Sequence, residues 1–280
     1  MLVGLRSSKH IPPFELFRPA SVEEACRACS GPGRAALMAG GLDLIDRLKA
    51  GEPVDRVIHL AGIGELAGIR RDGDAVSIGA LTTHAELVQS KLLAELLPEF
   101  PAVWRTIANP RVRAAGTIGG NLMSAMPHYD ACPALLALDA EAVAVDRSGA
   151  HAAFDLRALP GRDIILAQVR VTVTPFQRRL LADRSLHPIV SVYLGASVEN
   201  GKVHSARIAA GCAYVRPAVV EFPVAGMPVG TLGSAAAALA RAAAGLLPEP
   251  MSDGLASGSY RRRMIEVLAR RLLIKLGSQP

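Results

Sequence analysis

The segment 116–121, which reads Gly-Thr-Ile-Gly-Gly-Asn, constrains the fold of this chain more than any other stretch. Three glycines within five residues cost backbone entropy and bury no side chain, so the segment is a poor piece of core. Glycines at this density let a backbone come close to a ligand, most often a phosphate held by main-chain N–H groups. The segment therefore predicts a glycine turn at a binding site.

A second glycine segment lies upstream at 38–43, which reads Met-Ala-Gly-Gly-Leu-Asp. The apolar run 35–38 predicts a short strand before it, and 42–49 predicts a helix after it. A strand, a glycine turn and a helix in this order present free N–H groups to a phosphate. Taken alone, the segment could be an ordinary tight turn. Two such segments indicate one extended nucleotide cofactor that is held at two points.

At these residues the chain resembles the FAD-binding subunits of the molybdenum-containing hydroxylases, the family of carbon monoxide dehydrogenase and bacterial xanthine dehydrogenase. The two flavin signatures of that family, approximately A-G-G-T-D-L and G-T-I-G-G-N, correspond to 39–44 and 116–121. Further likeness lies at 78–84, at 109–113 and in the last helix with its entry. The resemblance extends from about Phe14 to about Leu273, which is nearly the whole chain.

The resemblance implies an α+β fold, in which a two-part PCMH-type FAD-binding fold precedes a C-terminal α+β domain with a small antiparallel sheet and helices. We place the N-terminal FAD-binding subdomain at 1–55, the second FAD-binding subdomain at 56–176 and the C-terminal domain at 177–280. The resemblance also implies FAD on this chain, with molybdopterin on a large partner subunit and two-iron iron–sulfur clusters on a small one. We expect a dimer of heterotrimers.

The site residues follow from the two signatures and from the positions that match the flavin contacts of the family. No catalytic side chain and no metal ligand is assigned to this chain. The expected cofactor-binding residues are Met38, Ala39, Gly40, Gly41, Leu42, Asp43, Ile107, Thr117, Ile118, Gly119, Gly120, Asn121, Asp130, Ile165 and Leu166.

Several of these positions keep an alternative interpretation. By resemblance, Thr117 and Asn121 contact the phosphates or the ribityl chain, whereas a β-turn with a locally bonded Asn would need no ligand. Asp130 matches an aspartate that holds a ribose hydroxyl, and it could also cap the helix predicted at 131–138. Ile165 and Leu166, with Ile107 as a weaker candidate, are expected against the flavin ring or in plain core.

Leu42 departs from the family pattern, in which a Thr or a small polar residue often stands at this position. A leucine supplies no hydroxyl to a phosphate. Because backbone N–H groups provide most of the hydrogen bonds to a bound phosphate, Leu42 does not remove the prediction that this segment binds the cofactor.

The composition of the chain excludes some classes of function. The chain has 280 residues, a formal net charge of +6 and 4% aromatic residues, and its arginines are spread along the sequence. We therefore expect no nucleic-acid partner. A surface that binds a partner protein, or an anionic cofactor, accounts better for the net positive charge. The segment 1–13 lacks the apolar region of a secretory signal. No apolar run approaches the ~18 residues of a membrane span, so we expect a soluble, cytoplasmic chain without a membrane span.

The cysteines predict no metal centre. Cys26 and Cys29 form a CxxC pair, but 21–29 reads as a helix with Ser21 as N-cap and Glu24 completing a capping box. Cys132 and Cys212 lie in unrelated segments. Because an iron–sulfur cluster usually needs four thiolates, we expect none on this chain.

The remaining pattern predicts the elements of the second and third parts. Asp72-Gly73 and Asn200-Gly201 are hairpin signals. The last helix has an apolar stripe at helical spacing, and its arginines at 261–263 form either a solvated basic face or a docking surface for a partner. We expect strands at 56–60, 68–71, 75–79, 141–146, 164–173, 189–199 and 202–211, and helices at 84–97, 101–108, 131–138, 233–244 and 260–276.

These observations predict an FAD-carrying electron-transfer subunit of a heterotrimeric molybdopterin-dependent hydroxylase or dehydrogenase. It would take electrons from the two-iron clusters of a partner and pass them to a final acceptor. The alternatives are a free-standing FAD-dependent oxidoreductase and a flavin-free scaffold subunit, the latter supported only by Leu42.

Overall fold

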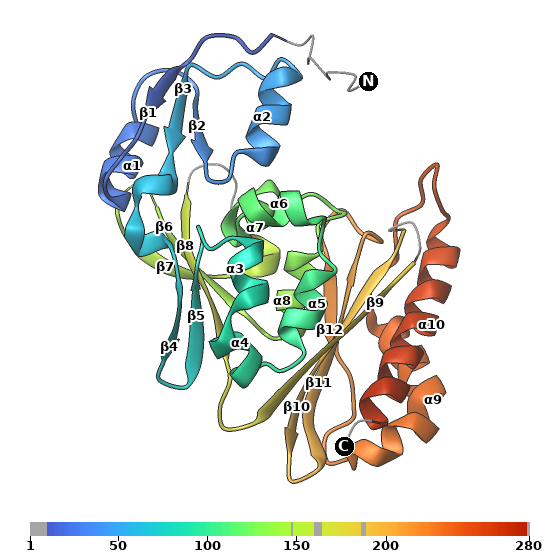
Figure 1. Ribbon diagram of the computed structural model, residues 1–280. Helices are drawn as coiled ribbons and strands as arrows, with labels where there is room; N and C mark the ends of the chain where they lie inside the picture. The colour runs from blue at the N-terminus through green and yellow to red at the C-terminus, as the bar shows by residue number, and fades with distance from the viewer. Residues whose placement is uncertain (1–9, 147, 160–163, 186–188, 279–280) are drawn as a thin grey trace, which may run out of the picture.

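The computed structural model describes residues 10–146, 148–159, 164–185 and 189–278. Three sheets, each with its own helices, follow one another along the chain (Figure 1). Helix and strand segments are mixed throughout, and the last sheet is a small antiparallel one. The structure therefore confirms the expected α+β class.

The first unit is a parallel sheet of three strands with two helices, and its strand order is β1-β3-β2. The predicted strand 35–38 and helix 42–49 are confirmed at both ends. The strand expected at 56–60 ends one residue earlier. It pairs with both other strands, although we began the second unit at residue 56. The elements are β1 (Glu15–Phe17), α1 (Val22–Cys29), β2 (Ala35–Met38), α2 (Leu42–Lys49) and β3 (Arg56–His59).

Helix α1 begins much as its sequence predicts. The Ser21 side chain accepts a hydrogen bond from the Glu24 N–H at 3.2 Å, but the Glu24 carboxylate accepts from the Ala20 N–H and not from that of Ser21. The capping box is thus displaced by one residue. Cys26 and Cys29 both lie on this helix, and neither forms a disulfide with another described cysteine.

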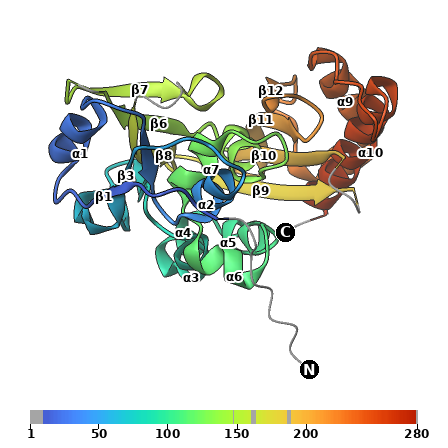
Figure 2. The ribbon, with the colours of Figure 1, turned by 90° about the horizontal axis from the view of Figure 1, so that it is seen from above.

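The second unit is a sheet of five strands in the order β4-β5-β8-β6-β7. Figure 2 shows β6, β7 and β8 on one side of this unit and α3, α4, α5 and α6 on the other. The elements are η1 (Leu60–Gly62), η2 (Gly64–Leu66), β4 (Ile69–Asp72), β5 (Ala75–Gly79), α3 (His84–Gln89), α4 (Lys91–Leu96), α5 (Phe100–Arg105), α6 (Pro110–Ala115), α7 (Ile118–Ser124), α8 (Ala131–Ala137), β6 (Glu141–Val145), β7 (His151–Asp155), η3 (Leu156–Ala158) and β8 (Ile165–Thr172).

Some elements of this unit differ from the prediction. The single helix expected at 84–97 is two helices that meet at Ser90, whose side chain accepts from the Leu93 N–H and starts α4. The expected glycine turn 116–121 is mostly the first part of helix α7. Helix α6 and strand β7 were not predicted. Four of the five β7 residues are exposed and only Phe154 is half-buried, so this edge strand shows no alternating pattern.

The third unit is an antiparallel sheet in the order β12-β11-β10-β9, with α9 and α10 packed on it. The hairpin at Asn200-Gly201 is confirmed, and both residues have positive φ angles as its turn requires. The elements are β9 (Gln177–Arg184), β10 (Ser191–Glu199), β11 (Lys202–Gly211), β12 (Ala218–Glu221), η4 (Val229–Thr231), α9 (Leu232–Leu246) and α10 (Gly258–Gly277).

The last helix confirms its apolar stripe, because Ile265, Leu268, Leu272 and Leu276 are all buried. Its arginines correct the idea of one basic face. Arg261 is buried, and its guanidinium donates to both carboxylate oxygens of Asp253 and to the Cys212 carbonyl, each at 2.7 Å. This arginine thus ties the preceding loop and the end of β11 to α10.

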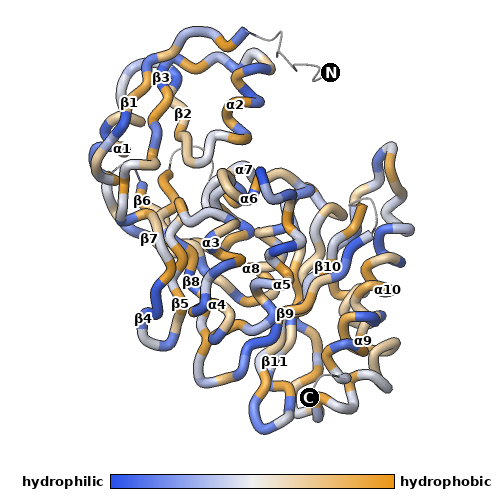
Figure 3. The backbone as a smooth tube through the Cα atoms, viewed as in Figure 1, coloured by the Kyte–Doolittle hydropathy of each residue, from blue (hydrophilic) through white to orange (hydrophobic). Residues whose placement is uncertain are grey.

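One helix corrects the expectation that no apolar run reaches membrane length. By length and composition alone, the 18 residues 229–246 could cross a membrane. In this fold α9 packs against α10 and the sheet through a buried row that includes Leu232, Ala236 and Ala240. Figure 3 shows hydrophobic stretches on both helices.

Candidate functional site

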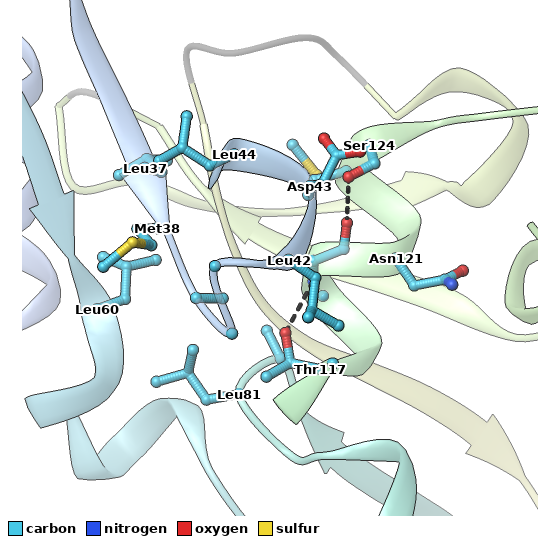
Figure 4. Close-up of a pocket in the computed structure, with 18 of the residues that line it drawn as sticks. Leu37, Met38, Leu42, Asp43, Leu44, Leu60, Leu81, Thr117, Asn121 and Ser124 are labelled. Atoms are coloured by element: carbon cyan, nitrogen blue, oxygen red, sulfur yellow. Dashed lines mark hydrogen bonds between the residues drawn. The ribbon is translucent and has the colours of Figure 1, made fainter. Parts of the chain in front are cut away.

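A cleft of about 970 Å³ lies between the first and second units. Its wall combines β2 and α2 with the starts of α3, α7 and β8. All the predicted site residues line it except Ile118. In Figure 4 the aliphatic Leu37, Met38, Leu60 and Leu81 lie to one side of the first glycine segment, and Thr117, Asn121 and Ser124 lie on α7 and its cap at the other. The fold thus brings both signatures to one site.

Ile118 is a correction to the predicted set. Its side chain is fully buried in the core of the second unit, and its N–H donates to the Thr82 carbonyl at 3.0 Å. Neither its side chain nor its N–H faces the cleft, because both are used to attach α7 to the segment before α3.

The first glycine segment has the predicted strand-turn-helix form. Gly41 precedes α2 with a φ of +78°, a left-handed conformation that favours glycine, and it has no side chain to cap the helix. Among the described residues, no acceptor bonds the N–H groups of Leu42, Asp43 or Leu44. These three donors lie at the positive end of α2, which is a suitable place for an anion.

The second glycine segment is built differently. Thr117 caps α7, and its hydroxyl oxygen accepts from the Gly120 N–H at 3.1 Å. The Gly119 N–H donates to the Ala80 carbonyl at 2.8 Å, and a Cβ at Gly119 would lie 2.7 Å from the Ala80 Cβ. The N–H groups that we expected to hold phosphates therefore bond within the protein.

The glycines of the two segments also pack against each other. A Cβ on Gly40 would lie 1.8 Å from the Ala115 carbonyl oxygen, so glycine is required at this crossing. Gly120 differs, because its Cβ would meet only the Thr117 hydroxyl at 3.0 Å and the Ala39 Cβ at 3.9 Å. Gly120 is thus the glycine of α7 whose open side faces the first segment across the cleft.

Two buried oxygens in the cleft wall accept no hydrogen bond from the described residues. They are Oδ1 of Asn121 and Oδ1 of Asp130. The turn with a locally bonded Asn is therefore not what the structure shows. Asp130 precedes α8 without a side-chain capping bond, and its other oxygen accepts from Arg184 at 3.3 Å. Buried acceptors without a partner are costly, so both oxygens suit the donors of a ligand.

Asp43 and Tyr129 join the two sides of the cleft. The Tyr129 hydroxyl donates to Asp43 Oδ1 at 3.4 Å, and Arg47 lies 3.7 Å from the other oxygen of the carboxylate. Burial, followed by the Asp43 charge, raises the pKa of Tyr129. Tyr129 lines the cleft although sequence reasoning assigned it no role, and its position eight residues after Asn121 offered no signal.

The aliphatic part of the wall is Ile107, Ile165 and Leu166, all buried. Ile165 belongs to the core under α1, and Leu166 belongs to the main core of the second unit. The two interpretations of these residues are therefore compatible, because each packs in a core and also lines the cleft. Leu42 is different, since 41% of it is exposed.

His84 is another cleft residue that sequence reasoning left without a role. It is buried, it lines the cleft, and its Nδ1 accepts a hydrogen bond from the Trp104 Nε1–H at 3.1 Å. Burial, with a smaller effect of the Arg113 charge, lowers the pKa of His84 to about 4. Its backbone is set by a capping box at Thr83 and Glu86, the one local signal that the sequence held.

The arrangement fits an elongated ligand with an anionic part. Free backbone N–H groups lie at the start of α2, and the acceptors without partners are the side-chain oxygens of Asn121 and Asp130. Aliphatic side chains form another part of the cleft wall. Within the described ranges, no group of three or more His, Cys, Asp or Glu residues could hold a metal ion. The cleft is therefore suited to an organic cofactor of dinucleotide size.

Comparisons with known proteins agree with this geometry. The family described as FAD binding domain in molybdopterin dehydrogenase matches residues 12–158. The chain is 31% identical to the 6-hydroxypseudooxynicotine dehydrogenase complex subunit alpha of Paenarthrobacter nicotinovorans, over 94% of each chain. It is 30% identical to the carbon monoxide dehydrogenase medium chain of Afipia carboxidovorans, over 92% of this chain and 94% of that one. A chain of the reconstituted CO dehydrogenase from Oligotropha carboxidovorans has the same fold, with a TM-score of 0.80, 27% identity and coverage of 94% and 96%.

Proposed function

This chain belongs to the family of FAD-binding domains of molybdopterin dehydrogenases, and we propose that it is the electron-transfer subunit of a heterotrimeric molybdopterin-dependent hydroxylase or dehydrogenase. The chain is an oxidoreductase subunit, and FAD is its cofactor. On this proposal a small iron–sulfur subunit with two-iron clusters delivers electrons, and a large molybdopterin subunit oxidises the substrate. The proposal includes a dimer of heterotrimers, a final acceptor that takes the electrons and a cytoplasmic location.

The observation that supports this proposal best is the pairing of free donors and free acceptors in one cleft. Bound FAD supplies a ring that accepts and releases electrons, and the protein has to hold that ring and shape its surroundings. The N–H groups of Leu42, Asp43 and Leu44 are suited to the pyrophosphate. Oδ1 of Asp130 is suited to a ribose hydroxyl, and Oδ1 of Asn121 to another donor of the cofactor.

The apolar residues of the cleft have a separate part in the proposal. Ile107, Ile165 and Leu166 exclude water from one wall and offer a flat aliphatic surface to the ring. Asp43 and Tyr129 link the two sides of the cleft through the hydrogen bond between them. These residues bind and position, and the proposal gives none of them a proton to transfer.

A spectrum tests the cofactor and a reduction assay tests the role. The purified chain is incubated with FAD, desalted and examined for flavin bands, and we expect about one equivalent of bound flavin. The chain is then mixed anaerobically with its partner subunits and their substrate, and we expect the flavin bands to bleach only in the complex.

Each alternative predicts a different result. A chain that binds FAD and is bleached by an organic substrate without partners would be a free-standing oxidoreductase. A chain that stays colourless both alone and in the complex would be a flavin-free scaffold. Bleaching that requires the partners supports the proposed electron-transfer role.

A further inference from the structure

His84 lies where the two glycine segments meet. Its backbone N–H donates to the Gly116 carbonyl at 2.9 Å. A Cβ on Gly116 would lie 3.1 Å from the His84 Cδ2 and 3.3 Å from the Leu42 Cδ1, so the imidazole and the Leu42 side chain border the same glycine. Leu42 is the first residue of α2. His84 therefore borders the cleft beside the side chain of the first residue of α2.

The contact with Trp104 determines which imidazole nitrogen carries the proton. An indole N–H can only donate, so His84 Nδ1 has to be the acceptor in this pair. The neutral imidazole then carries its proton on Nε2. The lowered pKa, about 4, keeps the ring neutral at physiological pH. Trp104 is itself buried and stacked on Phe100, with 4.5 Å between ring centroids, so the donor of this hydrogen bond is fixed in place.

The Nε2–H of this ring has no acceptor among the described residues. Nε2 is not one of the buried side-chain atoms that lack a partner, so this N–H reaches the open space of the cleft. Because the rest of His84 is almost wholly buried, the acceptor of this N–H is a water or a ligand in the cleft.

We propose that His84 donates its Nε2–H to a phosphoryl oxygen of the FAD pyrophosphate and so supplies the side-chain hydrogen bond that Leu42 cannot. The anionic part of the cofactor belongs beside the free N–H groups of Leu42, Asp43 and Leu44, and the His84 ring borders the same glycine as the Leu42 side chain. A neutral donor with a fixed tautomer adds a directed hydrogen bond there without needing to be charged. Trp104 acts as a positioning residue through His84.

This inference rests on the proposed FAD site, and wild-type binding measured in the same experiment tests that site separately. His84→Phe keeps a ring of similar size and removes the donor, whereas His84→Gln keeps an N–H of similar reach. The FAD dissociation constant is measured by flavin fluorescence for the full chain, and ³¹P NMR and visible spectra are recorded for the bound cofactor.

We expect His84→Phe to bind FAD on the order of tenfold to a hundredfold more weakly, the effect of one hydrogen bond to a charged group. His84→Gln should recover most of this loss. The ³¹P resonances of bound FAD should differ between the wild type and His84→Phe, while the visible bands stay in place. Equal affinities would overturn the proposal, and so would shifted visible bands with unchanged ³¹P resonances, because the donor would then serve the ring.

A measurement on the unmutated chain covers the case in which the variants do not fold. The His84 Nε2–H signal of ¹⁵N-histidine-labelled protein is assigned by its proximity to the Trp104 indole. It should shift when FAD is added and also when saturating ADP is added, because ADP carries a diphosphate without a flavin ring. A signal that shifts with FAD but not with ADP overturns the proposal.

Discussion

The two glycine segments of the cleft look alike in sequence and differ in structure. In the first, at 38–43, the N–H groups at the start of α2 have no acceptor among the described residues. In the second, at 116–121, the N–H groups of Ile118, Gly119 and Gly120 all bond within the protein. A dense run of glycines thus indicates close approach, but the approaching group can be a ligand or another part of the same chain. The hydrogen bonds of the backbone distinguish the two cases.

The two glycine segments therefore contribute different groups to cofactor binding. The first segment offers main-chain donors to an anion. The second offers side-chain groups, above all the free oxygen of Asn121, and a gap at Gly120. The two segments touch where Gly40 packs on the Ala115 carbonyl. Cofactor binding therefore depends on this packing contact as well as on the hydrogen-bonding groups.

The crossing of the segments should show the largest effect. Gly40→Ala places a Cβ 1.8 Å from a backbone oxygen, so one segment has to move. We expect about 4 kcal/mol of lost unfolding free energy, at the upper end for overpacking, together with loss of FAD binding. Urea denaturation and an FAD titration measure both. Gly64→Ala is the matched control, because its Cβ would meet nothing within 4 Å. A stable Gly40→Ala variant that binds FAD normally would show that the segments do not need this contact.

Acid should weaken the fold through His84, which joins the two segments. Its pKa is about 4 in the folded chain and 6.5 when unperturbed, so unfolding takes up a proton between these values. The stabilisation is complete above about pH 6.5 and is lost as the pH falls toward 4. We expect a loss on the order of 3 kcal/mol in unfolding free energy over this window. Denaturation of the wild type and of His84→Gln between pH 7 and 4 measures it, and identical slopes would exclude His84 as the cause.

Gly120 should separate cofactor binding from folding. A Cβ on Gly120 would have only the Thr117 hydroxyl within 3.4 Å. In Gly120→Val the new methyl groups therefore enter the gap between α7 and Ala39. We expect at least a hundredfold weaker FAD binding, about 3 kcal/mol, while the chain still folds. Flavin occupancy after desalting and the thermal midpoint check the two parts. Full occupancy in Gly120→Val would mean that the cofactor does not pass this glycine, and Gly120→Ala shows how much bulk is tolerated.

Local patterns predicted the first segment and not the second, for a physical reason. Strand 35–38, Gly41 and helix 42–49 depend on neighbours in sequence, so their spacing was enough. The partners of Ile118 and Gly119 are the carbonyls of Thr82 and Ala80, more than 30 residues earlier, and no local pattern shows such bonds.

The same limit applies to two side chains. The sequence pattern predicted Arg261 as part of a basic face. In the structure its guanidinium is buried, because it donates hydrogen bonds to Asp253 and to the Cys212 carbonyl. His84 received no role because its meaning depends on Trp104, which lies on another helix. Asp130 lies in the cleft wall, and only the structure shows that its side chain does not cap α8.

The smallest expected effect lies at Leu42, where the first segment lacks the side-chain donor of the family pattern. Leu42→Thr adds a hydroxyl at the start of α2, and little packing is lost because 41% of this leucine is exposed. We expect Leu42→Thr to bind FAD about fivefold more tightly than the isosteric control Leu42→Val, the effect of one hydrogen bond of about 1 kcal/mol. If His84 already supplies that bond, the gain should be larger in a His84→Phe background, and a double-mutant cycle measures the coupling. A gain that is the same in both backgrounds would mean that the hydroxyl and the imidazole contact different atoms of the cofactor, and the two segments would then bind it independently.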